Sequence, residues 1–411
     1  MKLENEKYRL SGGLDPLVLC EKYGTPLYVY DASIIEKQYR RLAGAFDVPK
    51  LELHFAMKAL SNINVLKLMK KLGAGLDCVS INEVRLGLRA GFEAEDITFT
   101  PNFADIDEFG EAVKLGVKII VDSIPMLENW GLHFAQYPIG LRINPHILAG
   151  GNYKISTGHI DSKFGISFHQ LPHAQRVIES QGLKIHGIHM HNGSDILDVG
   201  VFLEGAEILF DAARKFPNIE YIDCGSGFKV PYRDDDIETD IEEFGEKMSA
   251  RFRQFCEEYG RDVALVFEPG KFLVSPAGFF FAKCTTVKQT TATVFAGLDT
   301  GLNHLIRPMM YGSYHRIVNV SAPTFKPRIY TVVGNICETD TFGADRRIPE
   351  VVEGDILCFF NAGAYGWMMA SNYNSRFRPA EVLILDGKDH LIRRRESMDD
   401  ILRNQVELEI T

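Results

Sequence analysis

Lys58 stands at a position where an amine needs a chemical explanation. It ends the apolar run "HFAMK" (residues 54–58), which has the pattern of a β-strand, and "ALSN" separates it from the next helical pattern. An amine at the end of a buried strand is costly unless it has a partner or a task. One such task is Schiff-base formation, because an amine with a depressed pKa can attack a carbonyl compound.

Two later strand ends offer partners for such an amine. The turn "DCGSGF" (223–228) is rich in glycine, so its backbone N–H groups can converge on a phosphate. "EPGK" (268–271) places Glu268 where a carboxylate can face a ring nitrogen. Alone, these motifs could be a tight turn and an ion pair at the rim of the fold. Lys58, the glycine-rich turn and Glu268 together are the groups that a pyridoxal-phosphate site requires. A Schiff-base aldolase would not need Glu268.

The segment "IHMHNGS" (188–194) brings two histidines to one predicted strand. His189 and His191 are expected on the same face, because side chains alternate along a strand. Such a pair can hold a metal ion, so a metal-dependent barrel hydrolase is the alternative from another class of enzyme. That enzyme would need further histidine or carboxylate ligands from other strand ends, where Asp122 is available but the sequence offers no second histidine cluster. One imidazole stacked on a cofactor ring, with the other in a hydrogen-bonded core position, is the better explanation.

The elements that would position these residues alternate between strand and helix from about residue 30. Eight strand–helix units in roughly 240 residues match the size of a closed (β/α)8 barrel. We therefore predict an α/β fold with a TIM-like barrel over residues 31–275, and a doubly wound open sheet is the structural alternative. The strands are expected to end at "HFAMK", "GLDCVS", "ITFTPN", "KIIVDS", "IGLRIN", "IHGIHMH", "YIDCGSG" and "ALVFEPG".

The C-terminal ends of barrel strands form the active site in this fold. The predicted ends offer a set of polar and glycine residues to that surface: Lys58, Asp77, Asn102, Asp122, Asn144, His191, Gly225–Gly227 and Glu268. Such residues seldom all serve packing, so the predicted barrel implies a functional site there.

The pattern changes after about residue 275, where strand patterns follow one another without helices between them. These patterns predict an antiparallel β-domain over residues 276–411, in which "LDGKDH" has the composition of a hairpin turn. Residues 1–30 contain one more strand pattern, "TPLYVYD". We expect this strand to complete the second domain, although it could also cap the barrel.

Length, charge and cysteine usage narrow the class of protein. A chain of 411 residues is too long for one ordinary core, and 24% charged residues are typical of a soluble protein. The net charge of -10 argues against a nucleic-acid partner and against docking on an anionic membrane. There is no apolar run of membrane-spanning length and no signal-peptide core. The seven cysteines form no CxxC pair, so reduced thiols in the cytoplasm are expected.

Beyond these patterns, the sequence resembles the fold-type III pyridoxal-phosphate-dependent decarboxylases, and among them those that act on diaminopimelate. The resemblance runs from about residue 24 to about residue 386. It rests on the order and spacing of several motifs, any one of which could occur by chance: "FAMKAL", "STGHIDSKFGI", "HNGS", "DCGSGF", "EPGK", "DTGLNHLIRPMMYGSYH", "GNICETD" and "NAGAYGWMMASNYNSRFRPAEVL".

The resemblance implies roles for matching positions. Lys58 corresponds to the Schiff-base lysine, His191 to the histidine stacked on the cofactor ring, and Glu268 to the carboxylate at the pyridine nitrogen. Cys337 corresponds to the general acid that protonates the substrate carbon. The residues expected to bind pyridoxal 5'-phosphate are Lys58, His191, Ser194, Gly225, Ser226, Gly227, Glu268, Gly270, Lys271 and Tyr365. The residues expected to bind the substrate are Lys271, Arg307, Tyr311, Glu338 and Tyr365.

The resemblance also implies a reaction and an assembly. The reaction is the decarboxylation of meso-2,6-diaminopimelate to L-lysine and carbon dioxide, the last step of lysine biosynthesis. The assembly is an obligate homodimer, because Cys337 and Glu338 match residues that enter the site of the partner subunit. A decarboxylase of the same fold acting on ornithine, arginine or carboxynorspermidine is the nearest alternative. An inactive binding homologue is another, but the retention of Lys58, Glu268 and Cys337 argues against it.

Four positions depart from the family pattern. Leu60 stands where the lysine motif usually has asparagine, and Ser226 stands where the phosphate turn usually has a glycine. Lys271 replaces an arginine, so a bidentate fork becomes a point charge. "CET" replaces "CES" at Cys337, a small change. None of the four removes a group that the chemistry requires.

Overall fold

The structure is a computed structural model that describes residues 1–147 and 157–410. Ser156, the first residue of the "STGHIDSKFGI" motif, therefore lies outside the described residues. Contacts divide the chain into two compact units: residues 37–231 with 237–272, and residues 1–36 with 232–236 and 273–411. The domain limits predicted from the sequence, 31–275 and 276–411 with 1–30, remain a proposal, and the compact units differ from them at residues 31–36, 232–236 and 273–275.

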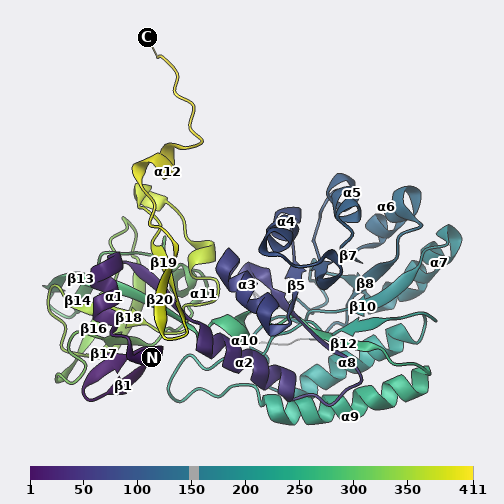
Figure 1. Ribbon diagram of the computed structural model, residues 1–411, viewed down its shortest axis with the longest axis horizontal. Coiled ribbons are helices and arrows are strands. Elements are labelled where there is room, and N and C mark those ends of the chain that lie inside the picture. The colour runs from purple at the N-terminus through teal and green to yellow at the C-terminus, as the bar shows by residue number, and fades with distance from the viewer. Residues whose placement is uncertain (148–156, 411) are drawn as a thin grey trace. The chain divides into compact units, whose positions relative to one another are not determined.

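Eight parallel strands form a closed barrel in the first unit (Figure 1). They are β4 (Leu51–Ala56), β5 (Gly75–Cys78), β6 (Ile97–Phe99), β7 (Lys118–Val121), β8 (Ile139–Asn144), β10 (Ile185–His189), β11 (Tyr221–Asp223) and β12 (Ala264–Phe267). A short strand, β9 (Ile166–Ser167), also pairs with β8. Because β10 pairs with β8 and β12 pairs with β4, the sheet closes on itself. The predicted (β/α)8 barrel is therefore confirmed, and the open-sheet alternative is wrong.

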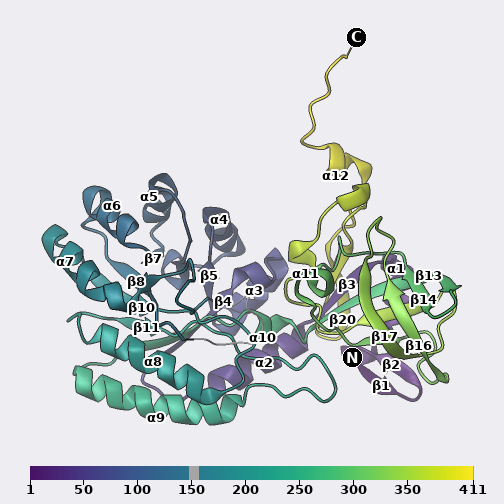
Figure 2. The same ribbon diagram turned by 180° about the vertical axis from the view of Figure 1, so that it is seen from behind.

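Helices cover the outside of the barrel, as Figures 1 and 2 show. Strands such as β5 and β12 are buried along their whole length, since parallel strands are covered on both faces. The helices between and around the barrel strands are α2 (Ala32–Gly44), α3 (Ile63–Leu72), α4 (Ile81–Ala90), α5 (Ile106–Leu115), α6 (Ile124–Phe134), α7 (Leu171–Gln181), α8 (Val199–Ala213), α9 (Ile241–Tyr259) and α10 (Lys271–Val274).

Short capped turns join several strand ends to the helices that follow. The Asn62 side chain accepts a hydrogen bond from the N–H of Asn64 at the start of α3, and the Ser80 side chain caps α4 in the same way. A cap of this kind satisfies a backbone N–H that has no partner within the helix. Lys58 lies in such a turn, within the 3-10 segment Met57–Ala59 between β4 and α3. Residues at the strand ends are thus held by ordered turns on a rigid barrel.

The second unit is built on a β-sheet of nine strands in the described chain (Figure 2). They are β3 (Leu27–Asp31), β13 (Gly278–Gln289), β14 (Val294–Leu298), β15 (Ile317–Asn319), β16 (Pro327–Val333), β17 (Thr341–Pro349), β18 (Ile356–Phe359), β19 (Ala380–Leu385) and β20 (Lys388–Arg393). Most pairs are antiparallel, but β3 with β19 and β14 with β16 are parallel. The sheet is therefore mixed rather than purely antiparallel.

Smaller elements complete this unit. They are the hairpin of β1 (Lys2–Glu4) and β2 (Lys7–Arg9) and the helices α1 (Pro16–Tyr23), α11 (Arg307–Tyr311) and α12 (Met398–Leu402). The predicted hairpin in "LDGKDH" is confirmed, because Leu385 pairs with Lys388. Asp386 and Gly387 form its two-residue turn with φ angles of 51° and 72°. The core of the unit includes Val29, Phe279 and Val382 on neighbouring strands.

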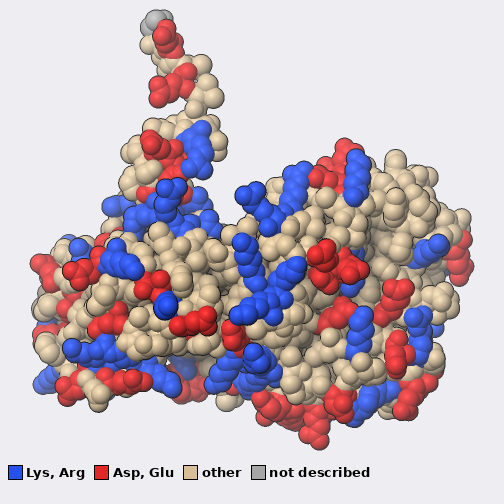
Figure 3. Space-filling model, in the orientation of Figure 1, with Lys and Arg blue, Asp and Glu red and all other residues tan. Residues whose placement is uncertain are grey.

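Two further features concern the charged side chains and the hydropathy of the helices. Figure 3 shows acidic and basic side chains intermixed over the face that it displays. None of the described helices combines the length and the apolar character that crossing a membrane requires.

Candidate active site

Lys58 reaches the C-terminal mouth of the barrel beside a buried carboxylate. Its Nζ lies 3.5 Å from Oδ2 of Asp77, which comes from the neighbouring strand β5. The Lys58 side chain is 37% exposed, whereas that of Asp77 is 1% exposed. The Thr100 hydroxyl donates a hydrogen bond to Oδ1 of Asp77. Burial and the charge of Glu268 raise the pKa of Asp77, and the charge of Lys58 opposes this rise. The amine is therefore held at the mouth and remains accessible.

The glycine-rich turn after β11 packs tightly against the loop after β10. Gly225 and Gly227 have φ angles of +64° and +131°, which favour glycine. A Cβ at Gly225 would lie 2.4 Å from the Met190 carbonyl oxygen, and one at Gly227 would lie 2.7 Å from that of Gly193. Any side chain at these two positions would strike the backbone of that loop, so this turn, which we call the glycine cradle, is restricted to glycine there. Such a backbone cradle is suited to a phosphate group.

His191 faces this turn as a neutral imidazole. The N–H of Ser226 donates to its Nδ1 over 3.3 Å, so that nitrogen carries no proton. Burial lowers the pKa of His191 to about 3, and the charge of Lys58 contributes to the same effect. The imidazole is therefore neutral and is anchored at one edge.

Glu268 is a buried carboxylate at the end of β12. His189 Nε2 lies 3.1 Å from both of its carboxylate oxygens. Burial acts to raise the pKa of Glu268, but the hydrogen bond with His189 and the charge of Lys58 hold it well below its usual range. Glu268 is therefore ionised and can hold a proton on a nitrogen heterocycle.

The two histidines of "IHMHNGS" have different partners. His189 contacts Glu268, whereas His191 lies beyond the end of β10 and contacts Ser226. In the part of the chain that the structure describes, the cluster that could hold a metal ion is His189, Asp223 and Glu268, with one ligand atom of each within 4.8 Å of the others. The hydrolase alternative rests on His189 and His191 as metal ligands, whereas the observed cluster contains His189 but not His191.

Lys271 connects the loops after β10 and β12. Its Nζ donates to Oγ of Ser194 over 2.8 Å and also pairs with Asp195, which has a φ of +63°. Lys271 is 7% exposed and so lies inside the mouth. Next to it, a Cβ on Gly270 would lie 3.0 Å from the Cβ of Ala56, so the backbone packs closely against the segment that carries Lys58. Leu60, where the family usually has asparagine, is buried in the core.

Arg307 forms the centre of a second group of site residues, in the unit built on the mixed sheet. Its guanidinium carbon lies 5.8 Å, 5.9 Å and 5.7 Å from the ring centres of Tyr232, Tyr311 and Tyr365. Arg307 is 8% exposed, and its Nε is buried without a hydrogen-bond partner. Among the described residues, no carboxylate lies within ion-pair distance of it. A buried cation without a counter-charge is costly, so this group is suited to an anionic ligand.

Tyr365 adopts a backbone conformation that is uncommon for a residue with a side chain. Its φ is 59°, in the left-handed region. Outliers of this kind cluster at ligand sites, where the surrounding structure holds them in place. The outlier supports a functional role for the "GAYG" turn.

Cys337 and Glu338 lie in the loop between β16 and β17 of the same unit. Cys337 is exposed, while the other six cysteines of the sequence are buried. Asn374 Nδ2 donates to the Cys337 sulfur over 3.2 Å, and the Tyr373 hydroxyl donates to Oε1 of Glu338 over 2.8 Å. The two residues are therefore held by the "SNYNSRFRPAEVL" segment and present a thiol to the surface.

The structure groups the predicted site residues into three sets. The barrel mouth brings together Lys58, His191, Ser194, Gly225, Ser226, Gly227, Glu268, Gly270 and Lys271. The second unit gathers Arg307, Tyr311 and Tyr365, and separately holds Cys337 and Glu338.

Sequence reasoning missed several partners of these residues. Four residues that contact a predicted site residue were not themselves predicted: Asp223, Asp195, Asn374 and Tyr373. Asp223 carried a usable signal, since it is a carboxylate at the end of a buried strand and directly precedes the phosphate turn. Nothing in the sequence pairs Tyr373 with Glu338.

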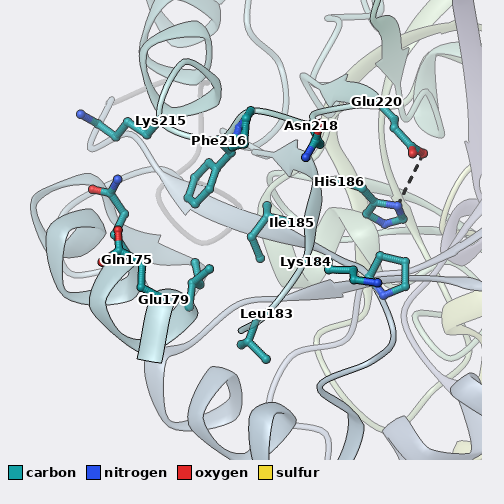
Figure 4. Close-up of a pocket in the computed structure, with 13 residues that line it drawn as sticks. Gln175, Glu179, Leu183, Lys184, Ile185, His186, Lys215, Phe216, Asn218 and Glu220 are labelled. Carbon is teal, nitrogen blue, oxygen red and sulfur yellow. Dashed lines mark ion pairs between the residues drawn. The ribbon is translucent and has the colours of Figure 1, made fainter. Parts of the chain in front are cut away.

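Two further cavities lie at the opposite end of the barrel. One, of about 450 Å³, is lined by Leu183, Ile185 and His186 at the start of β10, where His186 lies 3.7 Å from Glu220 (Figure 4). The other, of about 490 Å³, is lined by residues 50–54 at the start of β4. Because barrel enzymes place their chemistry at the C-terminal strand ends, neither cavity is the candidate site.

Comparisons with known proteins agree on one family. Residues 32–275 match the family described as pyridoxal-dependent decarboxylase, pyridoxal binding domain. The chain is 39% identical over 420 residues to the diaminopimelate decarboxylase of Methanothermobacter thermautotrophicus, with 98% of this chain and 97% of that protein covered. It is 36% identical over 404 residues to the diaminopimelate decarboxylase of Escherichia coli strain K12, with 94% and 95% covered. The crystal structure of diaminopimelate decarboxylase from M. jannaschii in co-complex with L-lysine matches with a TM-score of 0.91 at 29% identity, covering 99% and 98%.

Proposed function

This chain belongs to the pyridoxal-dependent decarboxylases, and on that basis we propose that it converts meso-2,6-diaminopimelate into L-lysine and carbon dioxide, the last step of lysine biosynthesis. It is a carbon–carbon lyase that uses pyridoxal 5'-phosphate. The observation that carries the choice of substrate is the buried guanidinium of Arg307, which has no carboxylate partner among the described residues.

The residues of the barrel mouth suit the cofactor. The glycine cradle at Gly225 and Gly227 would receive its phosphate, and the ionised Glu268 would hold a proton on its ring nitrogen. Lys58 supplies the amine for its carbonyl carbon, and the neutral ring of His191 would cover one face. When bound, pyridoxal phosphate accepts the electron pair left behind as carbon dioxide departs. The remaining cofactor contacts that we propose are Ser194, Ser226, Gly270, Lys271 and Tyr365.

Arg307 distinguishes diaminopimelate from the alternative substrates. Diaminopimelate carries a carboxylate at its distal end, whereas ornithine does not. A buried arginine surrounded by tyrosine rings can bind that carboxylate, because the guanidinium gains a counter-charge that the described residues do not provide. We propose that Tyr311, Tyr365, Glu338 and Lys271 form the other contacts with the substrate.

Replacing Arg307 by alanine tests this assignment. We expect kcat/KM for diaminopimelate to fall about 10–100-fold, because a hydrogen bond to a charged group contributes about 1.5–3 kcal/mol. The measurement is carbon dioxide release from diaminopimelate, ornithine, arginine and carboxynorspermidine, with cofactor absorbance recorded in parallel. Arg328→Ala, at an exposed arginine of β16, is the matched control. Full activity of Arg307→Ala on diaminopimelate, or a wild-type preference for ornithine, would contradict the assignment.

We also propose that the active unit is a homodimer with two shared sites. An acid that protonates a carbanion must be shielded from water, yet Cys337 is exposed in the single chain. A second copy that covers the Cys337 loop would resolve this conflict, with Cys337 as the acid and Glu338 beside it in the partner's site. We place the enzyme in the cytoplasm, where its seven free thiols would stay reduced.

Complementation between two inactive variants tests the shared site. Lys58→Ala and Cys337→Ser are each expected to lose activity, the second by roughly 10²–10⁴-fold as for the loss of a general acid. After the two are unfolded and refolded together, about half of the dimers contain both variants and have one intact site. We therefore expect about a quarter of wild-type carbon dioxide release. If mixed dimers form but remain inactive, the two residues serve the same chain's site.

A further inference from the structure

Behind Glu268 lies a group of three buried titratable side chains. His189 ends β10 and Asp223 ends β11, and the two residues are directly paired in the sheet register. His189 and Asp223 are each 1% exposed, and Glu268 is 4% exposed. One ligand atom of each lies within 4.8 Å of the others. Two carboxyl groups therefore share a nearly dry space with one imidazole.

The hydrogen bonds determine where the protons in this group can be. His189 Nε2 contacts both oxygens of Glu268, so that nitrogen carries its proton. His189 Nδ1 is buried without a partner, and a second proton there would be an unpaired donor, so the ring is neutral. Asp223 Oδ1 accepts the N–H of Gly225 over 2.8 Å, and an oxygen of Asp223 lies within 4.8 Å of an oxygen of Glu268. Two buried carboxyl groups this close are not both ionised, so they hold one proton between them.

We propose that Asp223 is a protonated carboxylic acid that donates a hydrogen bond to the ionised Glu268 and so positions it. The proton belongs to Asp223 because Glu268 already accepts the N–H of His189 and so is favoured as the charged partner. Burial and then the charge of Glu268 raise the pKa of Asp223 well above its usual value. The other charged group that raises it is Asp77 on β5, and the buried Arg142 on β8 faces the same interior.

This arrangement would give Asp223 two tasks in one site. Its hydroxyl would fix the orientation of Glu268 without adding a second negative charge beside it. Its other oxygen holds Gly225 at the start of the phosphate turn. Asp223 thus connects Glu268, at the ring-nitrogen end of the cofactor site, with Gly225 at the phosphate end. This inference rests on the proposed roles of Glu268 and Gly225. Asp223 is a positioning residue, because it acts through these two and not on the reacting atoms.

Infrared difference spectroscopy of the cofactor-free protein tests the proposal directly. A protonated carboxylic acid has a C=O stretching band that is resolved from the ionised carboxylates. We expect wild type at neutral pH to show one such band that Asp223→Asn lacks, while Asp262→Asn, at an exposed aspartate, keeps it. No lost band in Asp223→Asn would show that Asp223 is ionised and would overturn the proposal. Because no cofactor is present, a failure to bind pyridoxal phosphate would refute the proposed function without changing this result.

The pH dependence of stability gives a second readout. Above the unfolded pKa of about 3.9, the unfolded chain loses the Asp223 proton while the folded protein keeps it. The unfolding constant of wild type relative to Asp223→Asn should therefore rise by up to about tenfold per pH unit until the raised folded pKa is reached. A ratio that is flat or falls with pH would contradict the proposal.

Rescue separates positioning from general packing. Asp223→Ala removes both hydrogen bonds and should weaken pyridoxal phosphate binding about 10–100-fold. Asp223→Asn keeps an oxygen for Gly225 and an N–H donor for Glu268, so it should recover most of that affinity. Equal losses in both variants, or a bound divalent metal ion that Asp223→Asn removes, would overturn the assignment, because a metal-bound carboxylate is ionised.

Discussion

Replacing Lys58 by alanine should abolish decarboxylation, with a loss of roughly 10³–10⁶-fold, the range reached when a group that bonds covalently to the reacting partner is removed. The reason is that Lys58 is the amine held at the barrel mouth, 3.5 Å from Asp77 and still accessible. Its loss leaves Asp77 without that neighbouring cation and the cofactor without a covalent attachment. Carbon dioxide release and the visible absorbance of the bound cofactor measure the two effects together.

The control for this prediction is Lys67→Ala, which removes an exposed lysine of the next helix, α3. Its activity and absorbance should match those of wild type. If Lys58→Ala kept both the cofactor band and measurable turnover at the wild-type rate, another amine would have to be the attachment site.

The second large effect is expected for Glu268→Gln, with a fall in kcat of roughly 10²–10⁴-fold, comparable to the loss of an acid–base group. Glutamine has nearly the same volume, and its amide oxygen can still accept the N–H of His189. What it lacks is the negative charge that would keep the ring nitrogen protonated. The cofactor should still bind, because the cradle at Gly225 and Gly227 is unchanged.

The nitrogen-15 chemical shift of labelled cofactor would report that proton directly. We expect the shift of a protonated pyridine in wild type and of an unprotonated one in Glu268→Gln. Glu257→Gln, at an exposed carboxylate of α9, serves as the control. A protonated ring nitrogen in Glu268→Gln would assign this role to another residue.

The barrel was predictable because its signals are local. Each strand is a short apolar run that ends in a polar residue or is followed by one within two positions, and several of the helices that follow start at caps such as Asn62 and Ser80. The turn at Asp386 and Gly387 was equally local. The parallel pairing of β3 with β19 was not predictable, because it joins segments from opposite ends of the chain.

The candidate site was likewise predictable only where its signals are local in the sequence. The residue types and their places at strand ends gave Lys58, Glu268 and the glycine turn. The group of His189, Asp223 and Glu268 required the register between β10 and β11, which no spacing along the sequence reveals. The alternation that put His189 and His191 together holds only within the strand, and β10 ends at His189.

The separation of the site residues between the two units has a consequence for protein engineering. The barrel carries the groups assigned to the cofactor except Tyr365, and a side chain at Gly225 or Gly227 there would strike backbone atoms. Two groups assigned to the substrate alone, Arg307 and Tyr311, lie on the other unit. Libraries for directed evolution of a new amino-acid substrate can therefore leave the barrel loops constant and randomise the segments around these two residues, so that selectivity changes while the cofactor chemistry is inherited.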